Sequence, residues 1–418
     1  MPLARYRWLL MKQLSPSEAA LIAPITADAM LAQVMCWSAI NSGTGNLAGL
    51  ASMAALLADA FAVLPGKLTL EAPAPVTAIA VNGEETSGTF GKHLVLRVRP
   101  DAPRRILLTG HMDTVFPEDH HFKTLNWLDK NTLNGPGVAD MKGGIAVMLA
   151  ALSVFEASPG AARLGYDVLI NSDEEVGSPS SAPLIAQLAA GKHTALTYEP
   201  SALPDGTLAG ERAGSGNYSL VVTGRSAHAG RNPEDGRNAL VAAAGLALGL
   251  TGLKREGLSI NPSRIDGGSA VNVVPDMAVL RFNIRPDSAE IASEFETQLA
   301  RLIAMIEREH EVMIHRHGGM SRPPKPMDTR AERLFNLVRE CGAALGQPIH
   351  WQRSGGVCDG NNIAACGVPV VDTLGVRGGA IHSPDEYLIV ASLAERAALS
   401  ALVLHRLAEG HLAERSGA

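Results

Sequence analysis

Short runs rich in apolar residues alternate with amphipathic stretches in the first half of the chain. Residues 106–109, 167–170 and 194–198 have the length and composition of buried strands, and residues 143–155 have helical spacing. Strands that alternate with helices are typical of an α/β domain with a parallel sheet. We therefore predict a mostly parallel sheet in this part of the chain.

The pattern changes between residues 214 and 322. The expected elements follow the order β-α-β-β-α-β, which is typical of a ferredoxin-like module. They are strands at 218–223, 263–266, 277–284 and 311–315, and helices at 236–250 and 290–309.

After residue 322 the α/β pattern resumes. Helices are expected at 331–345 and 391–407, with a strand at 368–373. The sequence therefore predicts a discontinuous catalytic domain, residues 1–213 and 323–418, with residues 214–322 inserted as a smaller module. The length of 418 residues suits two units, because a single core rarely grows so large.

The composition indicates a soluble globular protein. The formal net charge is −6, whereas a nucleic-acid binder usually carries a basic surface. The apolar run 239–250 is shorter than the roughly 20 residues that span a bilayer, and no stretch is expected to cross a membrane. Four cysteines are too few for a disulfide framework. We expect a cytoplasmic protein that acts on small molecules and binds neither nucleic acid nor membrane.

Candidate metal ligands follow the predicted strands. His111 and Asp113 come directly after residues 106–109, and side chains two apart on extended backbone point the same way. His111 can offer a nitrogen to a metal while Asp113 orients it. Taken alone, such a pair is more often only a hydrogen-bonded strand end.

A single carboxylate, Asp140, lies among glycines before the helix predicted at residues 143–155. Glycines let the backbone approach closely, which favours a metal ligand. An aspartate that caps the helix would have the same surroundings, so the two interpretations are equally open.

Three consecutive acids, Asp173, Glu174 and Glu175, follow residues 167–170. Their mutual repulsion would be relieved by a cation or by solvent. Because adjacent side chains on extended backbone point apart, one glutamate can bind metal while the other acts as a base. That division suits two-metal hydrolysis.

Two further residues complete a possible ligand set. Glu199 ends the run 194–198, at an edge where ligand sites of parallel sheets gather, and His382 lies in a late glycine-rich loop. Each alone is more often structural. Together the oxygen and nitrogen donors suit zinc or a similar divalent ion, and five of them are enough for two ions. These are His111, Asp140, Glu175, Glu199 and His382.

Several motifs in order resemble the M20 metallopeptidases, in particular the glutamate carboxypeptidase branch. The motifs cover nearly the whole chain. They are Ser42-Gly43-Thr44-Gly45-Asn46, Gly110-His111-Met112-Asp113-Thr114, Gly135-Pro136-Gly137-Val138-Ala139-Asp140, Asp173-Glu174-Glu175-Val176-Gly177, Tyr198-Glu199-Pro200, Gly224-Arg225-Ser226-Ala227-His228-Ala229-Gly230 and Asn272-Val273-Val274-Pro275.

The resemblance implies a role for each candidate. Asp140 would bridge two zinc ions, with Co²⁺ or Mn²⁺ as possible substitutes. His111 and Glu199 would complete one site, and Glu175 and His382 the other. Glu174 would be the general base and Asp113 would orient His111. The inserted module would form a homodimer, with His228 reaching into the partner's site.

The resemblance also implies substrate contacts. Arg285 matches the arginine expected to hold a substrate α-carboxylate, and Asn272 and Arg322 match further substrate-side residues. Two segments depart from the family: Gly355-Gly356-Val357-Cys358-Asp359-Gly360 replaces Gly-Gly-Gly-Thr-Asp-Ala, and Thr207 stands where glutamate enzymes have a lysine.

The expected activity is therefore hydrolysis of N-acyl amino acids or small peptides beside a free carboxylate. One alternative is an aminoacylase or deacetylase that selects the acyl group. A second is an inactive metal-dependent protein that binds amino acids, although neither Glu174 nor a ligand is missing. Cys358 could suggest a nucleophile, but no base and orienting group accompany it.

Overall fold

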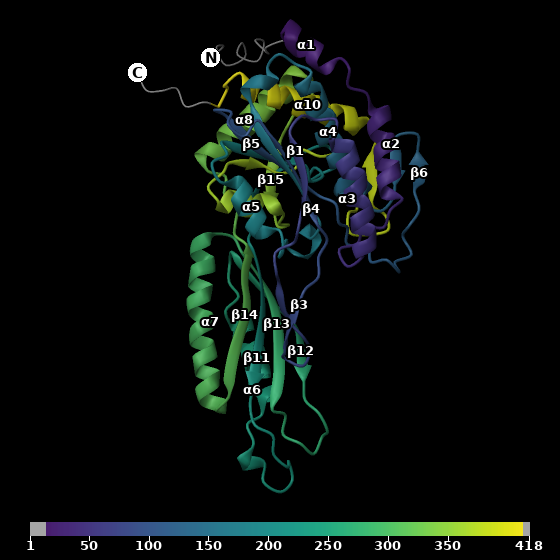
Figure 1. Ribbon diagram of the computed structural model, residues 1–418. Coiled ribbons are helices and arrows are strands. Elements are labelled where there is room, and N and C mark those ends of the chain that lie inside the picture. Colours follow the sequence, from purple (N-terminus) through teal and green to yellow (C-terminus); the bar gives the residue numbers. More distant parts are fainter. Residues whose placement is uncertain (1–13, 413–418) are drawn as a thin grey trace.

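The computed structural model describes residues 14–412 as two lobes joined by a narrow neck (Figure 1). A six-stranded sheet of order β1-β4-β8-β5-β9-β16 forms the centre of the larger lobe, and only β4 runs against the others. Its strands are β1 (Lys67–Glu71), β4 (His93–Val98), β5 (Arg105–His111), β8 (Gly165–Asn171), β9 (Thr194–Thr197) and β16 (Val370–Val371). The predicted mostly parallel sheet is confirmed.

Both faces of this sheet are covered because its strand residues alternate between two apolar layers. Leu108 and Leu96 join the larger core with helices α4 and α10, whereas Leu107 and Leu169 join a smaller core with α5 and α9. The helices of this lobe are α1 (Pro16–Ile22), α2 (Ala27–Ser38), α3 (Leu47–Phe61), α4 (Gly144–Glu156), α5 (Ala182–Ala189), α8 (Thr329–Ala344), α9 (Asp359–Ala365) and α10 (Ala391–Ala408).

Within residues 14–412, two helical stretches are long and apolar enough, by length and composition, to cross a membrane. They are Pro16–Ser38 and Val138–Glu156, so the expectation that no stretch would reach this threshold is wrong. The second is 83% buried inside the larger lobe. The first is two helices, α1 and α2, and its residues Met30, Val34 and Trp37 pack into the core.

The described residues form three further small sheets. One has the order β17-β18-β7-β6, another pairs β10 with β15, and the third is the hairpin β2–β3. Their bounds are β2 (Thr77–Ile79), β3 (Glu85–Ser87), β6 (Asn126–Asp129), β7 (Thr132–Asn134), β10 (Leu208–Arg212), β15 (Trp351–Ser354), β17 (Gly378–Gly379) and β18 (Tyr387–Ile389).

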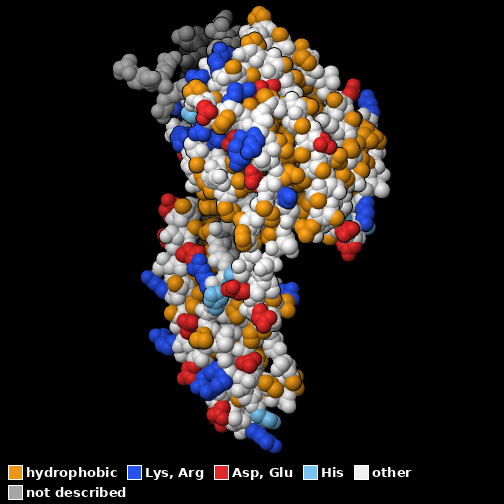
Figure 2. All heavy atoms as spheres, viewed as in Figure 1, with side chains coloured by type: hydrophobic (Ala, Val, Ile, Leu, Met, Phe, Trp, Pro, Cys, Tyr) orange, Lys and Arg blue, Asp and Glu red, His pale blue; other side chains and the backbone are white. Residues whose placement is uncertain are grey.

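The smaller lobe is an antiparallel sheet of order β12-β13-β11-β14 with two helices on one face. Its elements are β11 (Ser215–Thr223), α6 (Ala239–Gly252), β12 (Leu258–Gly267), β13 (Met277–Pro286), α7 (Ala289–His310) and β14 (Met313–Arg322). This is the predicted ferredoxin-like order; the domain boundaries at 213/214 and 322/323 stay a prediction. Charged side chains of both signs are spread over its surface (Figure 2).

The chain crosses the neck twice, and the two crossings are bound to each other. The backbone of Arg212 exchanges hydrogen bonds with that of Lys325. Both side chains also pair with buried Asp372, at 2.8 Å and 2.9 Å. In addition, Asn361 Nδ2 donates to the carbonyls of Ala213 and Pro323. The two linkers therefore leave the larger lobe as a single fixed pair.

The hairpin β2–β3 makes a further connection between the lobes. Arg281, on the face of β13 that points away from the helices, donates to the carbonyls of Ile79 and Ala80 in the hairpin. The larger lobe thus also contacts the middle of the insert's open sheet face.

Candidate active site

His111 and Asp113 come from the carboxyl end of β5, where the sequence predicted them. His111 Nδ1 lies 3.0 Å from the carbonyl oxygen of Asp113 and 3.4 Å from its Oδ1. These contacts orient the ring so that Nε2 faces the other acids. The carboxylate of Asp113 also accepts the backbone N–H groups of Glu174 and Glu175, at 3.1 Å and 3.2 Å. It therefore links the first ligand to the turn that carries both glutamates.

Asp140 lies in an irregular turn, Val138–Gly143 (η2), with non-helical dihedral angles of φ −112° and ψ 92°. It does not cap the following helix, whose N-cap is Gly143. The capping interpretation is therefore wrong. The close approach expected from the glycines is confirmed, because a Cβ on Gly144 would lie 1.9 Å from the carbonyl oxygen of Tyr198. Only glycine at this position lets the first residue of α4, directly after the turn, lie against the end of β9.

Glu174 and Glu175 lie on a 3₁₀ turn (Glu174–Val176, η4), and not on the extended backbone that the sequence suggested. Their side chains nevertheless go to different partners. Glu175 Oε2 lies 3.2 Å from His382 Nε2, whereas Glu174 Oε1 lies 2.8 Å from Arg322 Nη2. The third acid, Asp173, is buried and accepts hydrogen bonds from Ser180 and Ser181, which gives it a structural role.

His382 joins the cluster from a strained loop. Its φ of +63° lies in the left-handed region, which costs a non-glycine residue about 1–3 kcal/mol. Asp140 is shared between the two histidines: Oδ1 lies 3.1 Å from His111 Nε2, and Oδ2 lies 3.2 Å from His382 Nε2. Each oxygen of one carboxylate thus faces a different histidine.

Two groups of donor atoms follow from this arrangement. His111, Asp140 and Glu199 form one, and Asp140, Glu175 and His382 form the other, with the donor atoms of each group within 4.8 Å of one another. The five predicted ligands are therefore brought together around Asp140. Nitrogen and carboxylate donors without thiolate are those of catalytic zinc sites and related divalent ions.

The electrostatics of the cluster fit bound cations. Burial alone would lower the pKa of His111, but Glu199, Asp113 and Asp140 raise it well above its ordinary value. Hydrogen bonds to Asp140 and Glu175 raise the pKa of His382 to about 11. Burial, with the charge of Asp140, raises the pKa of Glu175 to about 7. Buried carboxylates are crowded here, and divalent cations would relieve the same repulsion that now favours protons.

A cavity of about 370 Å³ opens beside the cluster, between the two lobes. Glu174, Glu175 and His382 line it from the larger lobe, and Arg285 and Arg322 from the insert. Arg285 Nε donates to Asn283 Oδ1 at 3.0 Å, and none of the described carboxylates pairs with its guanidinium. Burial and the positive charge of Arg322 lower the pKa of Arg285. Arg322 is already paired with Glu174 and Asp359, so Arg285 is the guanidinium in this cavity that can bind an anion.

Two predicted site residues lie elsewhere. His228 and Asn272 belong to exposed loops at the end of the insert that is farthest from the neck (Figure 1). The loops are joined there, because Ala229 N–H donates to the carbonyl of Asn272 at 3.0 Å. They do not reach the cavity of their own chain. Thr207 precedes β10 and is not among the residues that line this cavity.

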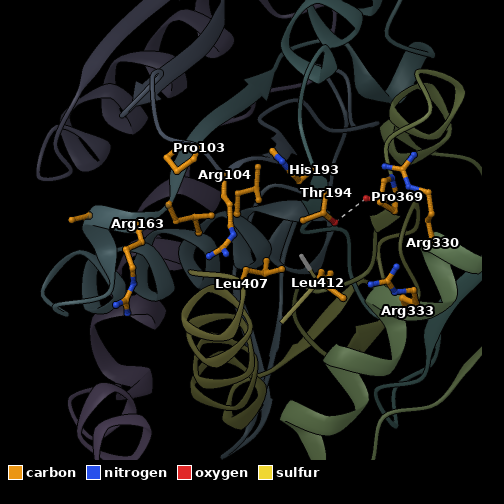
Figure 3. Close-up of a pocket in the computed structure, with 13 residues that line it drawn as sticks. Pro103, Arg104, Arg163, His193, Thr194, Arg330, Arg333, Pro369, Leu407 and Leu412 are labelled. Atoms are coloured by element: carbon orange, nitrogen blue, oxygen red, sulfur yellow. Dashed lines mark hydrogen bonds between the residues drawn. The ribbon is translucent and has the colours of Figure 1, made fainter. Parts of the chain in front are cut away.

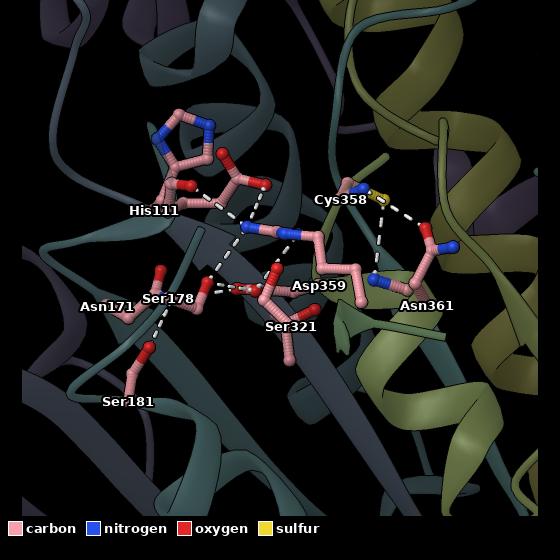
Figure 4. Close-up of polar contacts among 12 residues, drawn as sticks. His111, Asn171, Ser178, Ser181, Ser321, Cys358, Asp359 and Asn361 are labelled. Carbon is pink, nitrogen blue, oxygen red and sulfur yellow. Dashed lines mark hydrogen bonds and ion pairs between the residues drawn. The ribbon is translucent and has the colours of Figure 1, made fainter. Parts of the chain in front are cut away.

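Sequence reasoning did not assign a role to two acids that support the site. Glu386 accepts the backbone N–H groups of Gly137, Ala139 and Asp140, and so fixes the turn that carries the shared carboxylate. Asp359 accepts hydrogen bonds from Asn171 and Ser178 (Figure 4). Asp359 lies in the segment Gly355–Gly360 already noted, and Glu386 lies four residues after His382; neither position by itself indicated these contacts.

Cys358 has a structural position. Its thiol caps α9 by accepting from Gly360 N–H, and burial raises its pKa well above the ordinary value. A neutral thiol that is engaged in a helix cap is a poor nucleophile. The structure thus gives Cys358 the role of a helix cap and not that of a nucleophile.

The chain matches known proteins over most of its length. The sequence profile of Peptidase family M20/M25/M40 matches residues 107–406. Carboxypeptidase G2 from Pseudomonas sp. (strain RS-16) is 28% identical over 379 residues, which are 89% of this chain and 87% of that protein. Succinyl-diaminopimelate desuccinylase from Xanthomonas oryzae pv. oryzae (strain PXO99A) is 31% identical, over 72% of this chain and 83% of that protein.

Solved structures share the fold. A metallo-carboxypeptidase of the M20 family from Sulfolobus solfataricus superimposes with a TM-score of 0.68 at 15% identity, covering 90% of this chain and 99% of that one. A tripeptidase from Staphylococcus aureus gives a TM-score of 0.68 at 22% identity, covering 92% and 99%.

Proposed function

Since the chain belongs to peptidase family M20/M25/M40 and is a metallohydrolase, we propose that it cleaves the amide bond of N-acyl amino acids or small peptides beside a free C-terminal carboxylate. One observation carries the proposal. A single carboxylate, Asp140, is shared by two groups of donor atoms, and Glu174 lies next to them in a cavity that also contains two arginines.

The residues of the cluster suit this hydrolysis. Two divalent ions, which we expect to be Zn²⁺ with Co²⁺ or Mn²⁺ as substitutes, would polarise the scissile carbonyl and lower the pKa of a coordinated water. Glu174 is the group placed to accept the proton of the attacking water and to return it to the leaving amine. Asp113 holds both His111 and the turn that carries Glu174.

Arg285 is the proposed anchor for the substrate's carboxylate. A planar guanidinium can bind both oxygens of a carboxylate, and this one is half-buried with Nε already fixed by Asn283. The insert thus supplies the group that recognises the substrate, while the larger lobe supplies the chemistry. Thr207, which stands where glutamate enzymes have a lysine, is not among the residues that line the cavity, so it gives no basis for a side-chain preference.

The second candidate is an amidohydrolase that selects the acyl group. The desuccinylase at 31% identity favours it, because that enzyme's name describes removal of a succinyl group. The two candidates share the reaction and differ in which side of the scissile bond the cavity selects. A matrix of substrates that varies the acyl group and the amino acid independently separates them.

The assay begins with elemental analysis of the purified protein, for which we expect about two divalent ions per chain. Ninhydrin detection of released amines over N-acyl amino acids and dipeptides then identifies the substrate class. A chelator should abolish turnover, and added Zn²⁺ should restore it. Full activity in protein that contains no metal would contradict the proposed function.

We also propose a homodimer through the insert, in which His228 and Asn272 enter the partner's cavity. Their exposed position, far from the cavity of their own chain, supports this arrangement. His228→Ala and Glu174→Gln chains should each be inactive, but mixing them should restore part of the activity. One cavity of a mixed dimer then receives both intact groups. Absence of rescue after proven subunit exchange would contradict it.

A further inference from the structure

Arg322 is more deeply buried than is expected of a side chain that binds substrate. It is only 2% exposed, although it is the last residue of β14 and belongs to the insert. Its Nη2 lies 2.8 Å from Glu174 Oε1 and also donates to the carbonyl of Glu174 and to Ser178 Oγ, at 2.9 Å and 3.0 Å. Three contacts from one nitrogen fix both the backbone and the carboxylate of the same glutamate.

On its other side the guanidinium faces a carboxylate, although Nη1 makes no hydrogen bond with any described residue. Nη1 lies 3.4 Å from Asp359 Oδ1, and Asp359 is fixed by Ser178 Oγ and by Asn171 Nδ2. Figure 4 shows Ser178, Asp359 and Asn171 gathered around this point. Asn171 is the last residue of β8, so the contacts connect the arginine to the central sheet. Arg322, Ser178 and Asp359 thus surround one oxygen of Glu174, and the hydrogen bonds of this group run through Arg322 Nη2 and Ser178 Oγ.

Arg285 differs in every one of these respects. It is half-buried, lines the same cavity and has none of the described carboxylates as a partner. The resemblance assigns both arginines to the substrate side, but the contacts separate them: one guanidinium is committed to Glu174 and the other is open.

We propose that Arg322 is a positioning residue, which holds Glu174 by Oε1 and so leaves Oε2 as the oxygen that meets the reacting water. The inference rests on the proposed function, because it takes Glu174 as the base. A carboxylate held by one oxygen cannot rotate away between turnovers, which preserves the geometry that proton transfer requires. Arg322 also brings this support from the insert, so the base is correctly placed only when both lobes are in position.

The test compares Arg322→Met with Arg322→Lys, using Arg333→Met at the opposite edge of the sheet as a control. For Arg322→Met we expect kcat to fall by about 100-fold with KM changed less than about threefold. The loss should be equal for an N-acyl amino acid and for its amide. Arg322→Lys, whose ammonium group can still donate to Oε1, should retain part of the wild-type kcat. Asp359→Asn should also lower kcat.

Two readouts do not depend on turnover. Metal content should equal that of the wild type, and a crystal structure of Arg322→Met should show the Glu174 carboxylate rotated from its position. A rise in KM confined to acid substrates, with Glu174 unmoved, would overturn the proposal in favour of a substrate anchor. If the wild-type protein had neither bound metal nor hydrolytic activity, the proposed function would be refuted instead. The position of the Glu174 carboxylate in the Arg322→Met structure would still test whether Arg322 holds Glu174.

Discussion

Two cavities open at opposite edges of the central sheet. The larger, about 660 Å³, lies at the amino ends of the parallel strands, where Ile106, Thr194 and Pro369 line it. The smaller, about 370 Å³, lies at the carboxyl ends beside Asp140. By volume alone the larger cavity would be the better candidate for a ligand site.

The side chains give the opposite answer. The larger cavity contains four arginines, Arg104, Arg163, Arg330 and Arg333 (Figure 3), and none of the described residues that line it carries a carboxylate. Arg104 and Arg330 each donate to a backbone carbonyl, and Arg163 pairs with Glu409, so most of these charges serve the fold. In the smaller cavity, charges of both signs converge without being fully paired. Unbalanced, convergent charge therefore identifies the site better than volume does.

The largest effect should come from the two adjacent glutamates of the smaller cavity. Glu174→Gln should keep the metal and the fold but lower kcat about 10³-fold, because proton transfer is removed. Glu175→Gln should instead lower the metal content. Parallel kinetics and elemental analysis measure both effects, and near-normal turnover of Glu174→Gln would show that the two roles are reversed.

An intermediate effect is expected at Arg285. Truncation of one partner of a buried charge pair costs about 2–5 kcal/mol, so Arg285→Ala should lower kcat/KM at least about 100-fold on N-acyl amino acids. The matching amides, which lack the carboxylate, should be affected far less. Paired assays on acid and amide provide the measurement. An equal loss on both would exclude Arg285 as the carboxylate anchor.

The smallest effect should come from the larger cavity. Arg333→Ala removes a guanidinium of similar size at the opposite edge of the sheet, and kcat/KM should change less than about twofold. The assay is the same as for Arg285. A loss as large as that of Arg285→Ala would contradict the assignment of the site to the smaller cavity. It would show that the larger cavity, at the amino ends of the strands, also contributes to activity.

The carboxyl edge was predictable because its ligands follow recognisable strands. His111 and Glu199 come directly after short apolar runs, and parallel strands bring such ends to one edge. The ferredoxin-like order was predictable for the same reason, since strand and helix periods differ clearly along the insert.

Contacts between segments far apart in the sequence produce no pattern from which they could be predicted. Glu386 binds the backbone of Ala139, and Arg322 binds Glu174, across separations of 247 and 148 residues. The turn at Glu174 was also missed, because three acids after a strand are compatible with either extended or helical backbone. Only the folded chain places these groups together.

The paired linkers at Arg212 and Lys325 determine how the insert is attached to the rest of the chain. From the larger lobe, the whole insert is a single loop whose two ends are already hydrogen-bonded neighbours. The entropic cost of closing a loop grows only slowly with its length. The stability of the larger lobe therefore depends little on how many residues lie between these two ends. A segment of any size could have been acquired or exchanged at this point during evolution without disturbing the central sheet. The same junction that fixes the insert in place is thus the point at which the protein could most easily have grown.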